Sequence, residues 1–327
     1  MADLKTTYLG LDLKNPVMAS SSDLTGTVKG VRRCAEAGAG AIVLKSLFEE
    51  EIIAATGGSD GAVGSAFEEE ATRWLSETAR VQGPKEYLEF IRQCREEVDV
   101  PIIASVNGIS TRSWVEYAGQ IEHAGANALE LNIALMPLNL QEGSDQIEEH
   151  MGAIVRGVRK ATSLPITVKI GPWFTSIPRI VRDLTDAGAD GVVLFNRFYQ
   201  MDINPETIKP VPSNPYSSPA ELLLPLRWTA ILSPQINCDY SLSTGVHTGV
   251  DVVKALMAGA QVVQVASVLY LERVKAISTI ISELDKWLDR NAYPSVAAIT
   301  GKLAASGNYR PEELERLQFI KALTGRS

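Results

Sequence analysis

The sequence predicts an α/β fold: a single (β/α)8 TIM barrel domain over residues 1–327, with an N-terminal hairpin and long loops after strands 2, 4 and 6. First, eight short apolar runs alternate with segments of helical periodicity, and continuous apolar runs are typical of parallel strands buried on both faces. Second, a short Ala-Gly-Ala repeat recurs before strands. Third, the segment 241–270 reads as a strand–turn–helix–strand unit with a phosphate-binding pattern. An open doubly wound sheet is the alternative.

The N-terminal half begins with a hairpin, Thr7–Pro16, which Gly10 turns. The next predicted strands are Val17–Ser21, Ala41–Ser46, Pro101–Val106 and Ala128–Ile133. The predicted helices between them are Thr27–Ala37, Pro84–Val98, with a proline in its tolerant first turn, and Ser110–His123. A long, glycine-containing acidic loop occupies Leu47–Gly83, and its first acidic residues, Glu49–Glu51, are interpreted as a solvated face.

The C-terminal half continues the alternation after a second long loop. The predicted strands are Pro165–Ile170, Gly191–Phe195, Asn237–Leu242 and Gln261–Ala266. The predicted helices are Asp145–Ala161, Pro178–Ala187, Val250–Met257, Leu269–Leu288 and Pro311–Leu323. A proline-rich excursion, Arg197–Ser233, interrupts the pattern before the seventh strand.

The repeated Ala-Gly-Ala supports a closed barrel. Its glycines lie where a helix ends just before a strand, and a glycine there supplies a left-handed helix cap. They are Gly38, Gly125, Gly188 and Gly259. Repeated supersecondary units of this kind favour a closed barrel over an open sheet.

The strands end in polar residues, and active sites of such barrels lie at the carboxyl ends of the strands. Two lysines, Lys45 and Lys169, follow apolar runs and would have to be paired or hydrogen-bonded there. For any single serine or asparagine, a plain surface position is as good an interpretation. The complete predicted ring is Ser20, Ser21, Lys45, Ser46, Asn107, Asn132, Lys169, Asn196, Ser243, Thr244, Ala266 and Ser267.

A phosphate site is predicted at the last two strands. Backbone N–H groups of 244–246 and 266–268 would point to the same end of the sheet, where such groups attract a phosphate. Phosphate sites of these barrels often follow strands 7 and 8. The neighbouring His247 is interpreted as a solvated turn residue.

Composition excludes several classes of function. The net charge is −8 without a basic run, so nucleic acid is not an expected partner. Three scattered cysteines fit no metal spacing and suggest a reducing compartment. No run approaches the roughly 18 apolar residues of a membrane span, and the N-terminus lacks an apolar signal core. We therefore expect a cytoplasmic protein without a metal or a membrane partner.

Several segments together resemble one family, the dihydroorotate dehydrogenases, and in particular its soluble class 1 branch. The segments are LGLDLKNPVMASSS, GAIVLKS, PIIASVNG, ALELN, PITVKIGPW, GADGVVLFN, STGVHTGVDVVKALMAGAQVVQVASVLY and NAYPSVAAITGKL. The resemblance implies an FMN-binding barrel that oxidises dihydroorotate to orotate in pyrimidine biosynthesis, passing a hydride to flavin N5. It also implies a homodimer.

The resemblance assigns roles to the polar ring. Lys169 matches the lysine that stabilises negative charge at flavin N1 and O2, as preorganised electrostatics would. Lys45 and Ser46 match the flavin and substrate edge, and Asn132 and Asn196 match asparagines that touch flavin or substrate. Lys45, Asn132, Lys169 and Asn196 are the expected catalytic residues. The expected cofactor contacts are these four with Ser20, Ser21, Ser46, Asn107, Thr244, Gly245, Ala266 and Ser267.

The loop after the fourth strand departs from the family. The family reads N-x-S-C-P-N or N-x-S-S-P-N there, and its Cys or Ser is the general base. This chain has Ala134 and Leu135 at the Ser-Cys positions, and neither side chain accepts a proton. Ser176, Tyr199 or a water are possible replacements, and Asn139 could substitute for the missing second asparagine. The loop after the second strand also lacks the family's N-S-M-G-L-P-N segment.

Three hypotheses follow. The chain oxidises dihydroorotate with an altered base, or it oxidises another cyclic amide or unsaturated ring by the same chemistry. The third is a non-catalytic interaction subunit, against which the two retained lysines argue. Trp173 and Phe174 could cover a flat ligand or cap the barrel.

Overall fold

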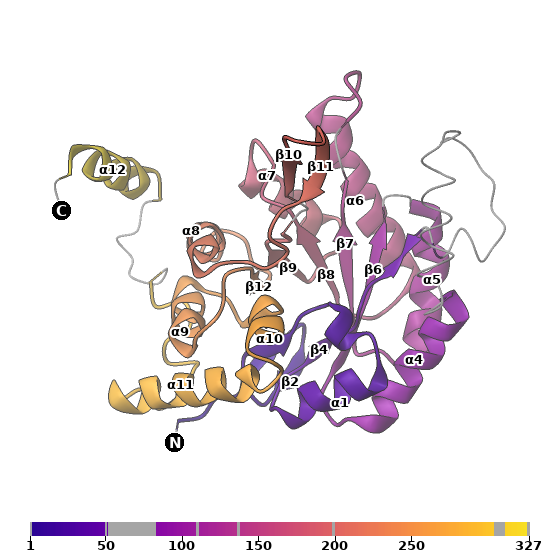
Figure 1. Cartoon of the computed structure of the whole chain (residues 1–327), viewed down its shortest axis with the longest axis horizontal. Helices are drawn as coiled ribbons and strands as arrows, with labels where there is room; N and C mark the ends of the chain where they lie inside the picture. The colour runs from indigo at the N-terminus through magenta and orange to yellow at the C-terminus, as the bar shows by residue number, and fades with distance from the viewer. Residues whose placement is uncertain are drawn as a thin grey trace.

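The computed structural model contains one large parallel sheet surrounded by helices (Figure 1). It describes residues 2–49, 51, 83–108, 111–135, 138–197, 200–303 and 311–325, so most of the predicted loop 47–83 lies outside the described residues. The sheet strands are β3 (Val17–Ala19), β4 (Ile42–Val43), β5 (Leu47–Phe48), β6 (Ile102–Gly108), β7 (Ala128–Ile133), β8 (Ile166–Ile170), β9 (Gly191–Leu194), β12 (Asp239–Ser243) and β13 (Val262–Val265).

The sheet closes into a barrel. Its order is β4-β3-β13-β12-β9-β8-β7-β6-β5, and β4 also pairs with β6. Since β4 and β5 both lie beside β6, they are two pieces of one barrel position. All pairings within the sheet are parallel. The predicted (β/α)8 barrel is therefore confirmed, and the open sheet is excluded.

Helices cover the outside of the barrel. They are α1 (Val28–Glu36), α4 (Pro84–Glu97), α5 (Thr111–His123), α6 (Ser144–Ala161), α7 (Ile177–Asp186), α8 (Leu223–Leu232), α9 (Gly249–Ala258), α10 (Ser267–Leu271) and α11 (Ala276–Arg290). The last described helix, α12 (Pro311–Thr324), is drawn away from the barrel in Figure 1. The four repeat glycines all adopt left-handed backbone, with φ of 101, 93, 111 and 110°. Their predicted role as helix caps is confirmed, because this φ favours glycine over other residues.

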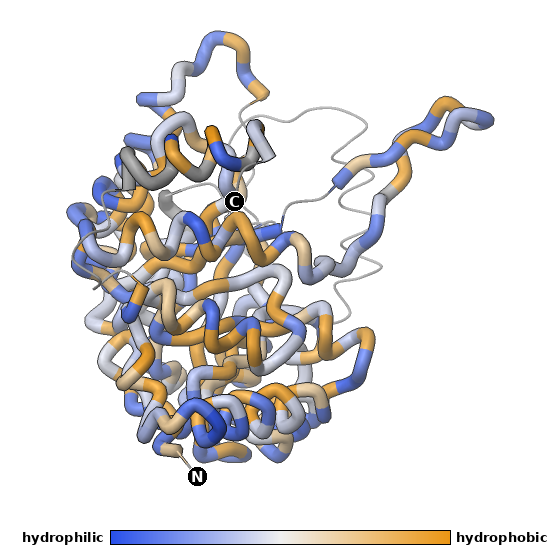
Figure 2. Tube along the Cα trace, turned by 90° about the vertical axis from the view of Figure 1, so that its left-hand side faces the viewer, coloured by the Kyte–Doolittle hydropathy of each residue, from blue (hydrophilic) through white to orange (hydrophobic). Residues whose placement is uncertain are grey.

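The core has two parts. A large cluster fills the space between strands and helices, and a smaller one fills the lower end of the lumen. The hairpin of β1 (Thr6–Tyr8) and β2 (Leu11–Leu13) closes that lower end, because Tyr8, Leu9 and Leu13 pack on lumen residues such as Met18 and Ile103. Hydrophobic residues accordingly concentrate along the inner segments (Figure 2).

Three local predictions were incomplete or wrong. The excursion 197–233 contains an antiparallel hairpin, β10 (Met201–Asn204) with β11 (Lys209–Pro212), a 3₁₀ turn η2 (Pro219–Leu222) and the helix α8. The predicted helix 269–288 is broken between α10 and α11, where Arg273 has a φ of 66°. Glu49 is buried rather than solvated, with its carboxylate against Gly108.

Candidate active site

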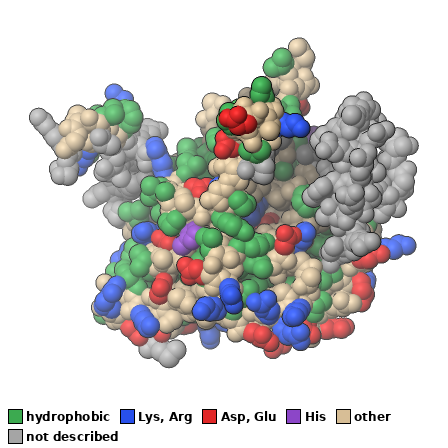
Figure 3. Space-filling view, viewed as in Figure 1, with side chains coloured by type: hydrophobic (Ala, Val, Ile, Leu, Met, Phe, Trp, Pro, Cys, Tyr) green, Lys and Arg blue, Asp and Glu red, His purple; other side chains and the backbone are tan. Residues whose placement is uncertain are grey.

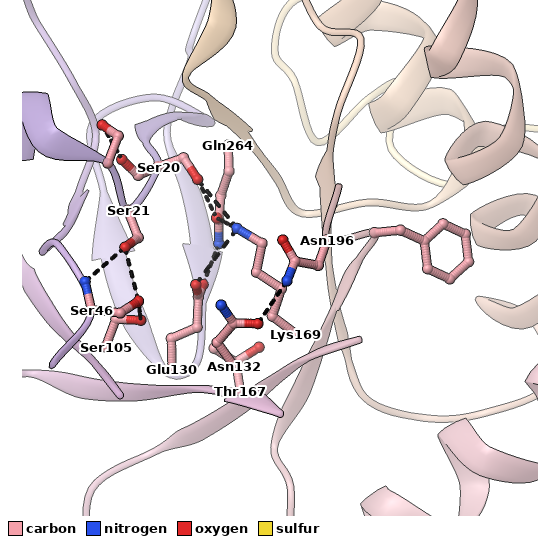
Figure 4. A network of polar contacts seen from close by, with 12 residues as sticks. Ser20, Ser21, Ser46, Ser105, Glu130, Asn132, Thr167, Lys169, Asn196 and Gln264 are labelled. Carbon is pink, nitrogen blue, oxygen red and sulfur yellow. Dashed lines mark hydrogen bonds and ion pairs between the residues drawn. The ribbon is translucent and has the colours of Figure 1, made fainter. Parts of the chain in front are cut away.

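The carboxyl ends of β3, β7, β8 and β13 bring four polar side chains together inside the lumen (Figure 4). Lys169 on β8 is 6% exposed, and its ammonium lies 3.3 Å from Ser20 Oγ and 3.4 Å from Gln264 Oε1. Glu130 Oε1 lies 3.8 Å from the same nitrogen. Ser20 also donates to Gln264 Oε1 at 3.1 Å. The predicted need of a buried Lys169 for partners is thus met.

Strand geometry explains why these residues meet. Side chains alternate between the two faces of a strand, so residues two apart share a face. Asn132 is paired in register with Lys169 on one side and with Asn107 on the other. Glu130, two residues before Asn132, therefore faces the lumen with it. Leu129 and Leu131 belong to the outer core instead.

The two predicted asparagines lie beside the lysine. Asn196 Nδ2 donates to Asn132 Oδ1 at 2.8 Å, and both side chains are half-buried (Figure 4). The structure thus brings Ser20, Asn132, Lys169 and Asn196 to one place. Asn107 is half-buried on the neighbouring strand.

A chain of hydroxyl groups lies on the other side of the lumen. Ser21 Oγ is 3.1 Å from Ser46 Oγ, which is 2.8 Å from Ser105 Oγ. Ser21 Oγ also accepts from the Ser46 amide at 3.0 Å. The backbone of Ser105 is in turn held by the hydroxyl of Tyr87 on α4. These bonds fix the predicted residues Ser21 and Ser46 against each other.

Lys45 is placed differently from Lys169. Its ammonium forms an ion pair with Asp23 Oδ1 at 2.7 Å, in the 3₁₀ turn η1 (Asp23–Thr25), and its stem contacts Gly26. Among the described residues, no hydrogen bond joins Lys45 to the Lys169 cluster. Its side chain is 34% exposed, so an ion pair there is worth little stability and could open at small cost.

The predicted phosphate turn lies after β12. Thr244 and Gly245 both have positive φ, 79 and 78°, and the Thr244 hydroxyl donates to the Phe195 carbonyl. The Gly245 N–H donates to Ser217 Oγ at 3.2 Å, and the same hydroxyl lies 3.0 Å from Ser267 Oγ. Ser217 thus joins the two predicted halves of the cradle, the turn after β12 and the start of α10.

The neighbouring His247 is half-buried, and its Nε2 lies 3.0 Å from the Ser217 carbonyl oxygen. This histidine therefore helps to hold the turn in place and is less solvated than predicted.

The loop after β7 offers no proton acceptor at the two positions of the family's Ser-Cys pair, Ala134 and Leu135. Leu135 is half-buried and packs on the outer core. Asn139 is exposed and accepts from the Gln141 amide, so it does not replace the family asparagine in this structure. Met136 and Pro137 lie outside the described residues.

The two proposed replacement bases gain no support. Ser176 is exposed and accepts from the Arg179 amide as the cap of α7. Tyr199 lies outside the described residues.

Trp173 is 74% exposed, whereas Phe174 packs on the core. Exposed hydrophobic side chains also appear on the upper part of the face in Figure 3, above a lower rim rich in charges.

Sequence reasoning missed several members of the site. They are Asp23, Ser105, Glu130, Ser217 and Gln264. A usable signal existed for three of them. Ser105 and Glu130 stand two residues before Asn107 and Asn132 in their strands, and Gln264 interrupts an apolar run.

Within the described residues, no helix is long and apolar enough to cross a membrane, and no group of three His, Cys, Asp or Glu side chains could hold a metal ion.

Comparisons with known proteins agree with this geometry. The dihydroorotate dehydrogenase family model matches residues 3–216. The chain is 28% identical over 308 residues to the Methanocaldococcus jannaschii dihydroorotate dehydrogenase B (NAD(+)), catalytic subunit, covering 87% of this chain and 93% of the relative. It is 27% identical over 317 residues to the Lactobacillus helveticus dihydroorotate dehydrogenase A (fumarate), covering 90% and 96%.

A third relative, from Thermoplasma acidophilum, has the same name as the first and is 27% identical over 308 residues, or 92% of this chain and 99% of its own length. The similarity therefore extends over almost the whole barrel. The family match covers more than half of the chain and includes the strands that carry Ser20, Asn132 and Lys169. The chain belongs to the dihydroorotate dehydrogenase family of oxidoreductases.

Proposed function

We propose that the chain is an FMN-dependent oxidoreductase acting on CH–CH groups, with dihydroorotate as substrate. The observation that carries the proposal is the buried Lys169, held at the carboxyl end of β8 beside the Asn132–Asn196 pair. Burying an ammonium has a desolvation cost even when it is paired, so its position at the mouth of the barrel favours a functional role. The names of the relatives support this substrate.

The residues present fit FMN. Lys169 would supply a positive charge for the flavin pyrimidine edge, and the amides of Asn132 and Asn196 would supply hydrogen bonds. At the turn after β12, a Cβ on Gly245 would lie 2.3 Å from the Leu222 amide nitrogen, so only glycine leaves the backbone of this turn in place. Ser217 and Ser267 add hydroxyl donors for a phosphate. FMN, when bound, would supply the hydride acceptor.

The protein residues have separate tasks. Lys169 would hold negative charge as it develops, which is worth more in a water-excluded site than in solution. Asn132 and Asn196 would orient the reacting ring. Ala134 and Leu135, at the positions of the family base, cannot take the substrate proton, and a positioned base contributes about 10²- to 10⁴-fold. We therefore expect slow dihydroorotate oxidation in which water accepts the proton.

The half-buried Leu135 favours a second candidate. An apolar side chain at the position of the family base suits a different cyclic substrate, whose oxidation needs no strong base at this position. This candidate uses the same flavin site and differs only on the substrate side.

One experiment separates the two. The purified protein is examined for a flavin spectrum, and dihydroorotate is then added without oxygen while the flavin absorbance is followed. Bleaching over minutes is the expected result. A yellow protein that keeps its colour would discard dihydroorotate and leave the second candidate. A colourless protein that takes up no added FMN would refute both.

We also propose a homodimer, on the family resemblance alone. Its test is the mass of the FMN-loaded protein in solution by light scattering, and a monomeric mass would contradict it.

A further inference from the structure

The lumen contains a buried carboxylate that the proposed reaction does not use. Glu130 on β7 is 0% exposed and lies below the Asn132–Asn196 pair. Burying a charged group is expensive unless it is paired and hydrogen-bonded. A charged glutamate at this position therefore needs a hydrogen-bonding or oppositely charged partner.

Its contacts identify that partner. Gln264 Nε2 donates to Glu130 Oε2 at 2.6 Å, whereas Oε1 is buried without a hydrogen bond and lies 3.8 Å from Lys169 Nζ. Among the described residues, the hydrogen bonds of the ammonium are long contacts with the neutral acceptors Ser20 and Gln264, at 3.3 and 3.4 Å. Glu130 is thus the negative charge that faces Lys169.

Two tyrosines that interact electrostatically with the carboxylate are neutral. Burial raises the pKa of Tyr8, whose hydroxyl donates to Thr167, and the pKa of Tyr87, whose hydroxyl donates to the Ser105 carbonyl. Both phenols therefore keep their protons at neutral pH. Among the described residues of the lumen, Glu130 and Lys169 form a pair with no net charge.

We propose that Glu130 is a positioning residue that holds the Lys169 ammonium in place and offsets part of its charge, which lowers the reduction potential of the bound flavin. The inference rests on the proposed FMN site. A group in hydrogen-bond contact with Nζ lies at most about 7 Å from Glu130 Oε1, because the 3.8 Å gap and a hydrogen bond of about 3 Å separate them. At that distance a unit charge shifts an equilibrium by roughly tenfold or more, even through an effective dielectric constant of about 20.

The test is a set of isosteric variants of the FMN-loaded protein, titrated anaerobically against a reference dye. Glu130→Gln should favour reduced flavin by about tenfold or more, which corresponds to at least about 30 mV for a two-electron couple. Lys169→Gln should move the potential in the opposite direction. The double variant replaces a neutral pair by two neutral amides, so its potential should lie nearer the wild-type value than that of either single variant.

Two further variants separate an electrostatic role from a structural one. Glu130→Asp keeps the charge and should restore most of the wild-type potential. Thr167→Val removes a lumen hydroxyl without changing any charge and should leave the potential unchanged. If Glu130→Gln does not fold, because it leaves a buried cation unpaired, the double variant compared with Lys169→Gln measures the same effect of the carboxylate.

The outcomes are distinct. The inference is overturned if Glu130→Gln raises the potential by less than the equivalent of a threefold change in the reduction equilibrium, or if it lowers the potential. The proposed flavin site would still stand in either case. A wild-type protein that binds no FMN overturns the proposed function, and this inference with it. Opposite shifts for the Glu130 and Lys169 variants support it.

Discussion

The turn after β12 permits a sharp prediction, because its glycine meets two separate requirements. Gly245 has a φ of 78°, and an added Cβ would lie 2.3 Å from the Leu222 amide nitrogen and 2.8 Å from its Cα. The left-handed conformation costs an alanine roughly 1–2 kcal/mol. The overlap with backbone adds about 1–3 kcal/mol, because the η2 segment must move.

Gly10 provides the matched control. Its φ is 69°, but an added Cβ would find nothing within 4 Å. Gly10→Ala therefore carries only the conformational cost, whereas Gly245→Ala carries both. Gly10 also lies in the hairpin at the lower end of the barrel, away from the strand ends that form the site.

The assay is FMN titration by fluorescence quenching, together with thermal unfolding of both variants. Gly245→Ala should weaken FMN binding at least about tenfold, or 1.4 kcal/mol, because the displaced turn no longer aims its N–H groups at the phosphate. Gly10→Ala should lower the melting temperature slightly and leave FMN affinity unchanged. Equal FMN affinities for the two variants would refute the placement of the phosphate at this turn.

Two further predictions concern single charges. Lys169→Gln should slow flavin bleaching by substrate about 10²- to 10³-fold in anaerobic stopped-flow measurements, and an unchanged rate would exclude Lys169 from the reaction. Hydrogen bonds from Ser163 and Thr162 hold the pKa of Glu122 at about 2, below its ordinary 4.5. Because the folded pKa is the lower one, the stabilisation is complete above about pH 4.5 and is lost as the pH falls toward 2. With the discount for solvent screening, Glu122→Gln should cost about 1 kcal/mol at neutral pH, a fall of about 2 °C in melting temperature. The same fall at pH 3 as at pH 7 would contradict this.

The barrel was predictable because its signals are local. Buried parallel strands are apolar throughout, and each helix that ends before a strand needs a left-handed cap, which the sequence marks with glycine. The excursion 197–233 carries no such signal. Its hairpin β10–β11 exposes Met201 and Ile203, and prolines accompany its second strand and the helix α8. Most of the described side chains of this hairpin are exposed, so no buried face marks it in the sequence.

The site was predictable only in part, for a different reason. Strand ends identify the residues that reach the mouth, and so Asn132, Lys169 and Asn196 were found. The residues one layer lower stand inside apolar runs, where Glu130 and Gln264 look like interruptions of a core strand. A period of two counted back from Asn132 would have placed Glu130 in the lumen. No pattern in the sequence indicated that Lys45 would pair with Asp23.

The departure in the loop after β7 leads to the last prediction. If the flavin half of the site is complete and only the base is missing, then Ala134→Ser with Leu135→Cys should restore rapid oxidation of dihydroorotate. Leu135 is half-buried against the core, so its replacement should cost at most a few kcal/mol of stability. The gain in bleaching rate should reach about 10²-fold and rise with pH toward the thiol pKa, because the thiolate is the active form.

The control is Ala134→Ser with Leu135→Ala, which opens the same space without a thiol. If both double variants bleach at the wild-type rate with FMN fully bound, a missing base does not limit the reaction. The limit would then lie in the loop after the second strand, where the family's amide-bearing segment is absent. In that case the Lys169 site would serve the flavin, whereas the altered loops would bind a different substrate. A substrate other than dihydroorotate would then be the better proposal.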